Sequence, residues 1–315
     1  MNEEKIVFGP VPSRRLGKSL GINNIFPKVC SYSCVYCQIG RTQNKEIERR
    51  AFYPPEKIEE QVKKILKKLK KKKEKVDYLS FVPNGEPTLD VNLGEEIEKL
   101  KIFGIKIAVI TNSSLLWKED VRKDIMKADW VSLKIDTVNE NVWKKINRPY
   151  KGINFKKLLE GIKIFSSQFK GFLTTETMII KKVNDTKKEF FEIGKFLKEI
   201  SPDKVYIGIP IRPPAEKWVL FPSEKKLTDF YIICKNFSLN VEFLTGYKQP
   251  ISFGFTGDIK RDIIAITSVH PMSKKQIIEF LKKANANWNI VEQLIQTKKI
   301  KEIRYQGEKY YLKKL

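Results

Sequence analysis

The stretch "CSYSCVYC", residues 30–37, places three of the four cysteines of this chain within eight positions. A structural zinc site needs four protein ligands, but the only histidine is the distant His270 and there is no second cysteine pair. Cys34 and Cys37 form a C-x-x-C pair, as in thioredoxin-like redox sites, yet Cys30 would then be surplus. Three thiolates suit a four-iron cluster bound at three corners, whose fourth iron is open to a chelating ligand.

Apolar, β-rich runs recur along the chain with amphipathic stretches between them, and the cysteines come just after the first such run. This alternation predicts an α/β fold with a parallel sheet and right-handed crossovers, either an open sheet or a partial barrel. Ligands of both architectures bind at the carboxyl ends of the strands. The expected strands are 19–26, 77–83, 105–112, 129–136, 172–180 and 204–211. One expected helix begins at Pro54–Pro55, and four more cover 92–102, 118–127, 154–167 and 186–199.

The pattern changes near residue 250, after a short strand-like "VEFLTG". We expect one helix over 258–269, a second begun by Ser273, a third over 287–299, and a hairpin around Gln306–Gly307. Three short helices followed by a hairpin resemble a winged helix. The sequence therefore predicts a core domain over residues 1–250 and a winged-helix-like domain over 251–315.

The charge balance favours a polyanionic partner. The chain has 61 Lys and Arg against 37 Asp and Glu, a formal net charge of +24, and residues 257–315 alone hold 13 basic against 6 acidic residues. An AT-rich coding sequence or a high growth temperature would also enrich lysine, and the lysine run at 63–75 could be no more than a solvated helix face. No apolar run approaches the ~20 residues of a membrane span. With its polar start, "MNEEK", the chain is expected to be cytoplasmic, with no membrane partner.

The spacing Cys-x3-Cys-x-Tyr-Cys, with Tyr36 before the last cysteine, resembles the signature of the radical S-adenosylmethionine (radical SAM) enzymes. The resemblance implies a partial (βα)6 TIM-type barrel and a [4Fe-4S] cluster ligated by Cys30, Cys34 and Cys37. It also implies that S-adenosylmethionine binds the open iron and is cleaved by an electron from the cluster, giving a 5'-deoxyadenosyl radical. An electron donor such as ferredoxin or flavodoxin would supply electrons to the cluster. Cys234, within the apolar "FYIICKNF", is expected in the core instead.

A second motif, "NGEPTL" at 84–89, follows the second expected strand and resembles the family's element for the methionine amino group. Gly85 would allow close backbone approach, Pro87 would fix the turn and Glu86 would accept from an ammonium, although Asn84 stands where the family often has glycine. Polar groups at the ends of the later strands would hold the ribose and the carboxylate. The full expected cofactor set is Tyr36, Gly85, Glu86, Pro87, Thr88, Asn112, Ser132, Lys134, Asp136, Thr175, Glu176 and Ile209.

The substrate is the least determined part of the sequence interpretation. "VPSRRLGKSLGIN", "GEPTL" and "RPPAE" resemble segments of the wyosine-synthase relatives, which act on tRNA, but the additional upstream cysteines of those synthases are absent before Cys30. Catalytic residues stay unassigned, with Lys134, Asp136 and Arg212 as candidates. We expect an RNA substrate, preferably tRNA. The alternatives are a peptide or protein substrate, as for a glycyl-radical activase, and an iron-sulfur transcriptional regulator.

Overall fold

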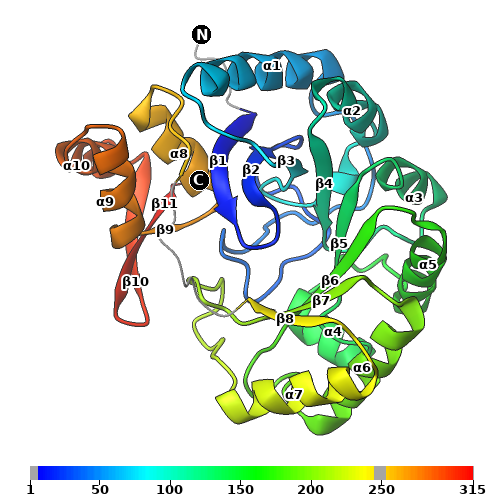
Figure 1. Cartoon of the computed structure of the whole chain (residues 1–315). Helices are drawn as coiled ribbons and strands as arrows, with labels where there is room; N and C mark the ends of the chain where they lie inside the picture. The colour runs from blue at the N-terminus through cyan, green and yellow to red at the C-terminus, as the bar shows by residue number, and fades with distance from the viewer. Residues whose placement is uncertain (1–5, 245–252, 315) are drawn as a thin grey trace.

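The structure is a computed structural model that describes residues 6–244 and 253–314. Its main feature is a curved sheet of eight strands, which follow one another in sequence order and form a half-barrel (Figure 1). The first two strands are antiparallel and every later pair is parallel. The strands are β1 (Val7–Ser13), β2 (Gly17–Ile22), β3 (Tyr78–Phe81), β4 (Lys106–Thr111), β5 (Trp130–Lys134), β6 (Phe172–Met178), β7 (Lys204–Gly208) and β8 (Val241–Leu244).

The expected α/β partial barrel is confirmed, and the six expected strands correspond to β2–β7. The structure adds β1, which the sequence did not predict, because Pro10 and Pro12 read as loop residues. A strand with prolines is tolerated here because β1 lies at the edge of the sheet, where an N–H donor is not needed on the outer side. The pairing of β1 with β2 is irregular between Phe8 and Val11.

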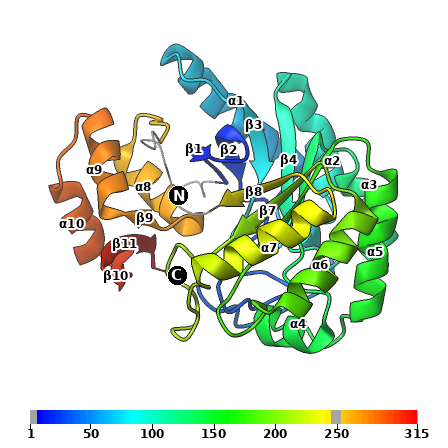
Figure 2. The same ribbon diagram turned by 60° about the horizontal axis from the view of Figure 1, so that its bottom comes forward.

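Helices cover the outer face of the sheet (Figures 1 and 2). They begin where capping residues predict, for example at Pro55 for α1 and after the Asn154 and Thr186 side-chain caps for α5 and α6. The short α4 was not predicted. The outer helices are α1 (Pro55–Lys71), α2 (Leu93–Leu100), α3 (Glu119–Ile125), α4 (Glu140–Asn147), α5 (Phe155–Gln168), α6 (Lys187–Ile200) and α7 (Glu224–Asn236), with 3-10 turns η1 (Pro87–Leu89) and η2 (Lys101–Phe103).

The two faces of the sheet differ because side chains alternate along each strand. On β3, Leu79 and Phe81 join the core beneath the helices, whereas Ser80 lines a cavity inside the half-barrel. On β6, Leu173 packs into the same core and Glu176 lines the cavity. Apolar burial against the helices therefore stabilises the sheet, and the concave face is left for polar groups. Cys234 of α7 is fully buried in this core, as expected.

The C-terminal residues form a smaller body with its own apolar core. The three expected helices and the hairpin are present, and Ser273 forms a capping box with Gln276. The hairpin is joined by the short β9 in a sheet of order β10-β11-β9. The winged-helix assignment stays a prediction, and the predicted boundary at 250 lies outside the described residues. The elements are α8 (Ile259–Val269), β9 (Met272–Ser273), α9 (Lys274–Lys283), α10 (Asn289–Gln296), β10 (Ile300–Tyr305) and β11 (Glu308–Lys313).

This C-terminal segment, residues 253–314, packs beside β1 (Figures 1 and 2). Phe8 of β1 contacts Ala265 and Val269 of α8, and the Gly254 N–H donates to the Pro10 carbonyl at 2.6 Å. The unexpected strand β1 is thus the surface on which the segment rests. Within the described ranges, no helix combines the length and the apolar character needed to cross a membrane.

Candidate active site

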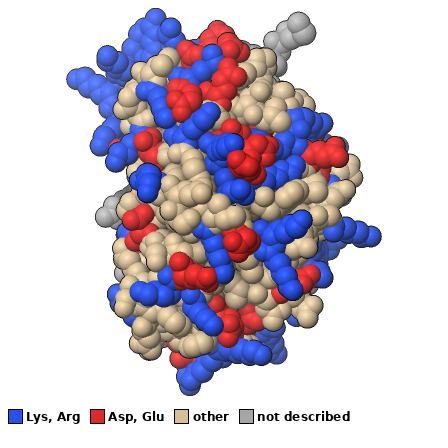
Figure 3. Space-filling view, turned by 90° about the vertical axis from the view of Figure 1, so that its right-hand side faces the viewer, with Lys and Arg blue, Asp and Glu red and all other residues tan. Residues whose placement is uncertain are grey.

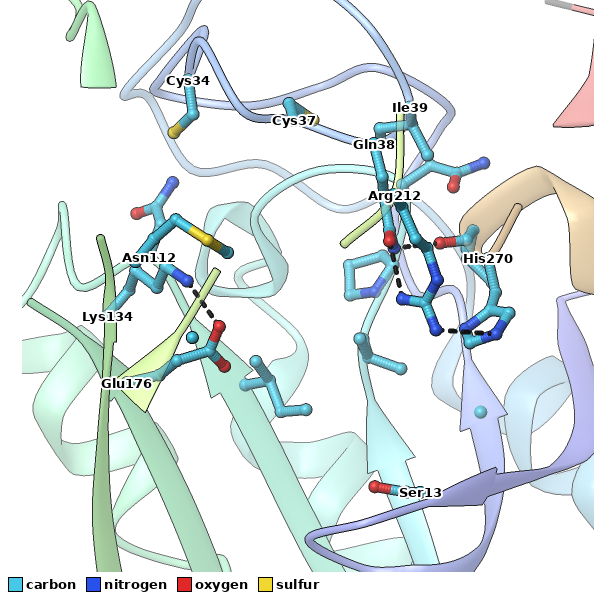
Figure 4. Close-up of a pocket in the computed structure, with 18 of the residues that line it drawn as sticks. Ser13, Cys34, Cys37, Gln38, Ile39, Asn112, Lys134, Glu176, Arg212 and His270 are labelled. Atoms are coloured by element: carbon cyan, nitrogen blue, oxygen red, sulfur yellow. Dashed lines mark hydrogen bonds and ion pairs between the residues drawn. The ribbon is translucent and has the colours of Figure 1, made fainter. Parts of the chain in front are cut away.

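A cavity of about 430 Å³ lies inside the half-barrel at the carboxyl ends of the parallel strands. Its walls come from the cysteine loop after β2, the ends of β3 to β7, and the end of α8. Figure 4 shows Cys34 and Cys37 along one side, with Lys134 and Glu176 on the strands below. The cavity therefore lies where the parallel strands end, which is the position at which the sequence predicts ligand binding.

The three clustered cysteines all line this cavity as free thiols. Backbone bonds from the Cys37 N–H to the Cys34 carbonyl and from the Gly40 N–H to the Cys37 carbonyl turn the loop inward. Amide groups of Asn112 and Asn147 approach the sulfurs of Cys30 and Cys34, each at 3.5 Å. Burial raises the pKa of all three thiols, that of Cys34 to about 12, so metal binding must displace their protons.

The donor set fits an iron-sulfur cluster better than a single metal ion. Among the described residues no three His, Cys, Asp or Glu side chains converge on one ion position. In a four-iron cluster each thiolate binds a different iron, so the three cysteine sulfurs lie around the cluster and do not converge on one metal position. Three inward cysteines, with amide donors beside two of the sulfurs, match that requirement.

Gly85 is forced to be glycine by close approach of the cysteine loop. A Cβ at this position would lie 1.7 Å from the carbonyl oxygen of Val29, the residue before Cys30. The next N–H, that of Glu86, donates to the same oxygen at 3.1 Å. Asn84 also lines the cavity, and both polar atoms of its buried side chain lack a hydrogen-bond partner within the described residues. Such orphaned groups in a cavity wall point to a ligand.

Glu86 is 1% exposed and ties the ends of β3 and β4 together. Its carboxylate accepts from the hydroxyl groups of Thr88 and Thr111, at 2.7 and 2.6 Å, and from the Asn112 N–H at 2.7 Å. Burial raises the pKa of Glu86, and these donors partly offset that effect. Contact with the methionine ammonium stays a prediction, and the bonds described here position the cavity wall. Thr88 and Pro87 lie behind this wall in η1 and do not line the cavity.

Lys134 and Glu176 form an ion pair at 2.6 Å across the neighbouring strands β5 and β6, and Arg15 also pairs with Glu176. Burial alone would raise the pKa of Glu176, but the charges of Lys134 and Arg15 outweigh it and hold this pKa at about 2. Lys134 lies 4.9 Å from the centre of the Tyr36 ring. This cluster is charged and buried, and it faces the cavity.

Asp136 lies just outside the cavity and serves as an acceptor for three segments. Its carboxylate accepts from the Tyr36 hydroxyl at 2.5 Å, the Asn147 amide at 2.8 Å and the Met178 N–H at 2.9 Å. Because Tyr36 directly precedes Cys37, these bonds connect the cysteine loop with β5 and β6. Asn147 belongs to the unpredicted helix α4, so sequence interpretation missed it.

The structure brings together most, but not all, of the expected cofactor residues. Ser132 is buried on β5, and Thr175 is fully buried on the outer face of β6, opposite to Glu176. Thr175 faces away from the cavity because adjacent side chains along a strand point to opposite faces, and its neighbour Glu176 faces the cavity. The expected residues that line the cavity are Cys30, Cys34, Cys37, Tyr36, Gly85, Glu86, Asn112, Lys134, Glu176, Ile209 and Arg212, whereas Pro87, Thr88, Ser132, Asp136 and Thr175 do not.

Two cavity residues come from the C-terminal segment, which sequence interpretation did not foresee. Val269 and His270 at the end of α8 line the cavity. Figure 4 shows His270 beside Arg212 of the β7 loop. Gln38, next to Cys37, joins them. The only available signal was that His270 is the sole histidine and stands at a helix end before a proline.

Comparison with known proteins identifies the family. Residues 24–194 match the model of the radical SAM superfamily. This chain belongs to that superfamily. A UPF0026 protein of Methanocaldococcus jannaschii is 48% identical over 311 residues, which cover 98% of this chain and 96% of that protein. A probable dual-specificity RNA methyltransferase RlmN of Endomicrobium trichonymphae is 25% identical over 65% of this chain and 59% of that protein.

Among solved structures, TYW1 with a lysine-pyruvate adduct bound superposes with a TM-score of 0.53. It is 16% identical and covers 69% of this chain and 73% of that chain, a likeness of fold. The resemblance to the radical SAM family is therefore confirmed, whereas the wyosine-related branch stays a prediction. As radical SAM enzymes use a [4Fe-4S] cluster and S-adenosylmethionine, these are the cofactors of the chain.

Proposed function

We propose that this radical SAM enzyme modifies RNA, with tRNA as the favoured substrate class. The observation that carries the proposal is that a basic C-terminal segment forms part of the wall of the cavity that holds the three cysteines, through Val269 and His270. A substrate held by the segment would therefore reach the cavity directly. A cytoplasmic location and a ferredoxin or flavodoxin electron donor belong to the same proposal.

The exposed surface of the C-terminal segment has the side chains that RNA binding needs. Val291 and Leu294 bury one face of α10. Amides can hydrogen-bond to base edges, and lysines can neutralise phosphates. Exposed residues on or beside α10 include Asn287, Asn289, Gln293, Gln296, Lys298 and Lys299, together with the acidic Glu292.

The basic surface continues onto α1, whose lysines at 63–73 are exposed in the structure. Lys72 at the end of α1 donates to the Phe255 carbonyl at 3.2 Å, so the lysine face adjoins the C-terminal segment. The face over α2, α3 and α5 is different, because acidic and basic side chains are interspersed there (Figure 3). Lys123–Glu119 neutralises charge on α3, and Lys163–Glu199 neutralises charge between α5 and α6. These contrasts favour RNA contact along α1 and the C-terminal segment.

The chain's own residues would have distinct tasks in the reaction. Cys30, Cys34 and Cys37 would hold the cluster, which when bound supplies the electron that cleaves S-adenosylmethionine. The Lys134–Glu176 pair would present fixed charges to the polar end of the cofactor. The side-chain amide of Asn84, which has no hydrogen-bond partner among the described residues, would bind the cofactor as well. The half-barrel and α8 would keep water from the reacting atoms.

The test compares modified nucleosides in tRNA and rRNA from cells with and without the gene, and from deletion cells that carry Cys34→Ala. We expect one modified nucleoside to disappear in the deletion strain, to return with the wild-type gene and to stay absent with the variant. An unchanged nucleoside profile would contradict an RNA substrate and favour a peptide. In parallel, the anaerobically reconstituted and reduced protein should form 5'-deoxyadenosine from S-adenosylmethionine, which an iron-sulfur regulator would not do.

A further inference from the structure

Lys28 carries a buried positive charge two residues before Cys30. Its side-chain nitrogen Nζ is shielded from solvent and has no hydrogen-bond partner within the described part of the chain. Removing an ammonium group from water without a partner is costly, so buried lysines are normally paired. A cation that the chain itself leaves unpaired points to a negative group that the chain binds.

The backbone at Lys28 gives no reason for a lysine at this position. Its φ is 68°, in the left-handed region where a Cβ crowds the main chain and where glycine fits without strain. The Lys28 N–H donates to the Asn84 carbonyl at 2.9 Å, a bond that a glycine would make equally well. The main chain would therefore accept glycine, and the ammonium group is what the lysine adds.

The ammonium group lies against the turn that begins at Cys37. A Cβ at Gly40 would lie 3.6 Å from the Lys28 Nζ, and the Gly40 N–H donates to the Cys37 carbonyl at 3.0 Å. Lys28 is not one of the described residues that line the cavity, whereas Cys30 and Cys37 both are. The charge of Lys28 therefore lies beside the cysteine loop and outside the cavity.

The charges around Lys28 identify the groups on which it acts. Burial lowers the pKa of Lys28, and negative charge on Cys37 and then on Cys30 opposes that shift. In return, burial raises the pKa of Cys37, and the Lys28 charge is the main effect that opposes it. Lys301 of β10 is a further cation near Lys28, but it is exposed and water screens its charge. The cysteine thiolates are thus the negative groups that the Lys28 charge favours.

Lys28 would gain its countercharge when the cysteines bind iron. Each cysteine loses its proton on binding the metal, so negative charge would then stand beside the ammonium group. Net charge and burial around an iron-sulfur cluster are among the factors that set its reduction potential. A fixed cation stabilises the reduced form more than the oxidised form, because the reduced form carries one more electron.

We propose that Lys28 is the counter-cation of the iron-sulfur cluster and raises its reduction potential. The inference rests on the proposed binding of the cluster by Cys30, Cys34 and Cys37, and it adds a residue to that site. Lys28 acts through the cluster and contacts neither S-adenosylmethionine nor the substrate. Its charge makes the cluster easier for an electron donor to reduce, and it leaves the cluster-free protein with an unpaired buried cation.

Lys28→Met keeps the length of the side chain and removes its charge. The full-length protein is reconstituted anaerobically and titrated with dithionite and redox mediators, and the reduced cluster is followed by electron paramagnetic resonance. The equilibrium constant for reduction should fall about tenfold, which is ~59 mV toward more negative potential for one electron. Lys28→Arg keeps the charge and should retain most of the wild-type potential. An unchanged potential in Lys28→Met, or an equal fall in Lys28→Arg, overturns the inference.

Thermal unfolding separates a counter-cation from a lysine with only a structural role. In the iron-free protein, Lys28→Met removes an unpaired buried charge, so the unfolding temperature should equal or exceed the wild-type value. In the cluster-loaded protein it removes a paired charge, so the unfolding temperature should fall. Equal losses in both forms would contradict the proposal. Lys28→Gln removes the same charge and replaces the methionine variant if that variant does not fold.

Lys301→Met is the matched control, because it removes the same charge from a nearby position that is exposed. Screening by water should keep the change in the equilibrium constant for reduction below about twofold. A shift as large as that of Lys28→Met would mean that the potential follows the total charge of the protein, and it would overturn the specific role of Lys28.

The inference and the proposals beneath it fail in different ways. If the cysteines bind the cluster and Lys28 has no part, Cys34→Ala loses the cluster spectrum while Lys28→Met keeps the wild-type potential. If the cysteines are not the ligands, Cys34→Ala keeps the wild-type spectrum and iron content, and the inference falls with the assignment. An unchanged nucleoside profile in deletion cells contradicts the RNA substrate alone, because the reduction potential is measured without substrate.

Discussion

Gly85→Ala should detach the cysteine loop from the end of β3. The added Cβ would lie 1.7 Å from the Val29 carbonyl oxygen and 2.8 Å from the Ile25 Cδ1, whereas ordinary contacts begin at 3.4 Å. The loop backbone would have to retreat by about 1.7 Å, the difference between 3.4 and 1.7 Å. This displacement approaches the ~2.3 Å length of a metal–thiolate bond, so Cys30 would no longer reach its iron.

The energetic cost has two parts. Overpacking a well-packed site costs about 1–3 kcal/mol. Loss of the Glu86 N–H bond to Val29 adds about 1 kcal/mol. A total of roughly 2–4 kcal/mol lowers the Tm by only about 4–8 °C in a chain of this size. The fold should therefore survive, while the affinity for iron falls about 10–100-fold, as is typical when a residue that positions a metal ligand is changed.

The assay is iron and sulfide content after anaerobic reconstitution, measured with 5'-deoxyadenosine formation and thermal unfolding. Gly104→Ala is the control, because a Cβ there meets open space but the φ of 64° costs about 1–2 kcal/mol. The control should lose stability and keep its iron. Wild-type iron content and wild-type S-adenosylmethionine cleavage in Gly85→Ala would refute the reasoning.

Three further changes test other parts of the molecule. Cys34→Ala should abolish S-adenosylmethionine cleavage, whereas Cys234→Ala should leave it nearly intact and cost only about 1–2 kcal/mol of core packing; equal losses would mean that the cluster ligands are misassigned. Glu176→Gln should remove about 3 kcal/mol of stability at pH 7, worked from the 2.5 units between the ordinary pKa of 4.5 and the folded value of about 2. Because the folded pKa of Glu176 is lower than its ordinary value, the contribution of Glu176 to the free energy of unfolding is complete above about pH 4.5 and is lost as pH falls toward 2. Urea unfolding of the wild-type and variant proteins should therefore show a smaller difference in this free energy at pH 3 than at pH 7. A difference that stays constant with pH would be inconsistent with the ion pair. Changing Lys298 and Lys299 together to Glu should weaken tRNA binding and reduce its salt dependence by about one unit of slope per lysine, and unchanged binding in a filter assay would remove α10 from the interface.

The sequence predicted features that depend on local chemistry. Strand periodicity located β2–β7, and cysteine spacing singled out the loop whose three thiols line the cavity. Ser273 correctly marked the start of α9, because a capping hydroxyl acts within one turn. Each of these features is decided by residues only a few positions apart.

Features that depend on tertiary contacts were missed. The edge strand β1 contains prolines that favour a loop, and only its pairing with β2 makes it a strand. Helix α4 is short, although Asn139 caps it and Trp143 and Ile146 are buried at helical spacing. The contacts of Arg212 with His270 and Gln38 join residues 58 and 174 positions apart, separations at which sequence patterns carry no distance information.

The placement of Thr175 shows a different limit. The sequence correctly located a polar strand end, and yet Thr175 and Glu176 were both assigned to the cavity. Alternation along β6 allows only one of the two to face inward, and the buried core beneath the helices accepted the smaller, uncharged threonine. Applying strand parity would have separated the two residues.

The contribution of α8 to the cavity has a consequence for biosynthesis. The three clustered cysteines precede Val269 and His270 by more than 200 residues, and the strands β3 to β7 lie between them in the sequence. These strands can therefore fold around the cysteine loop before the cavity wall at the end of α8 has been made. We expect iron and sulfide to reach the thiols from that side until α8 packs against β1.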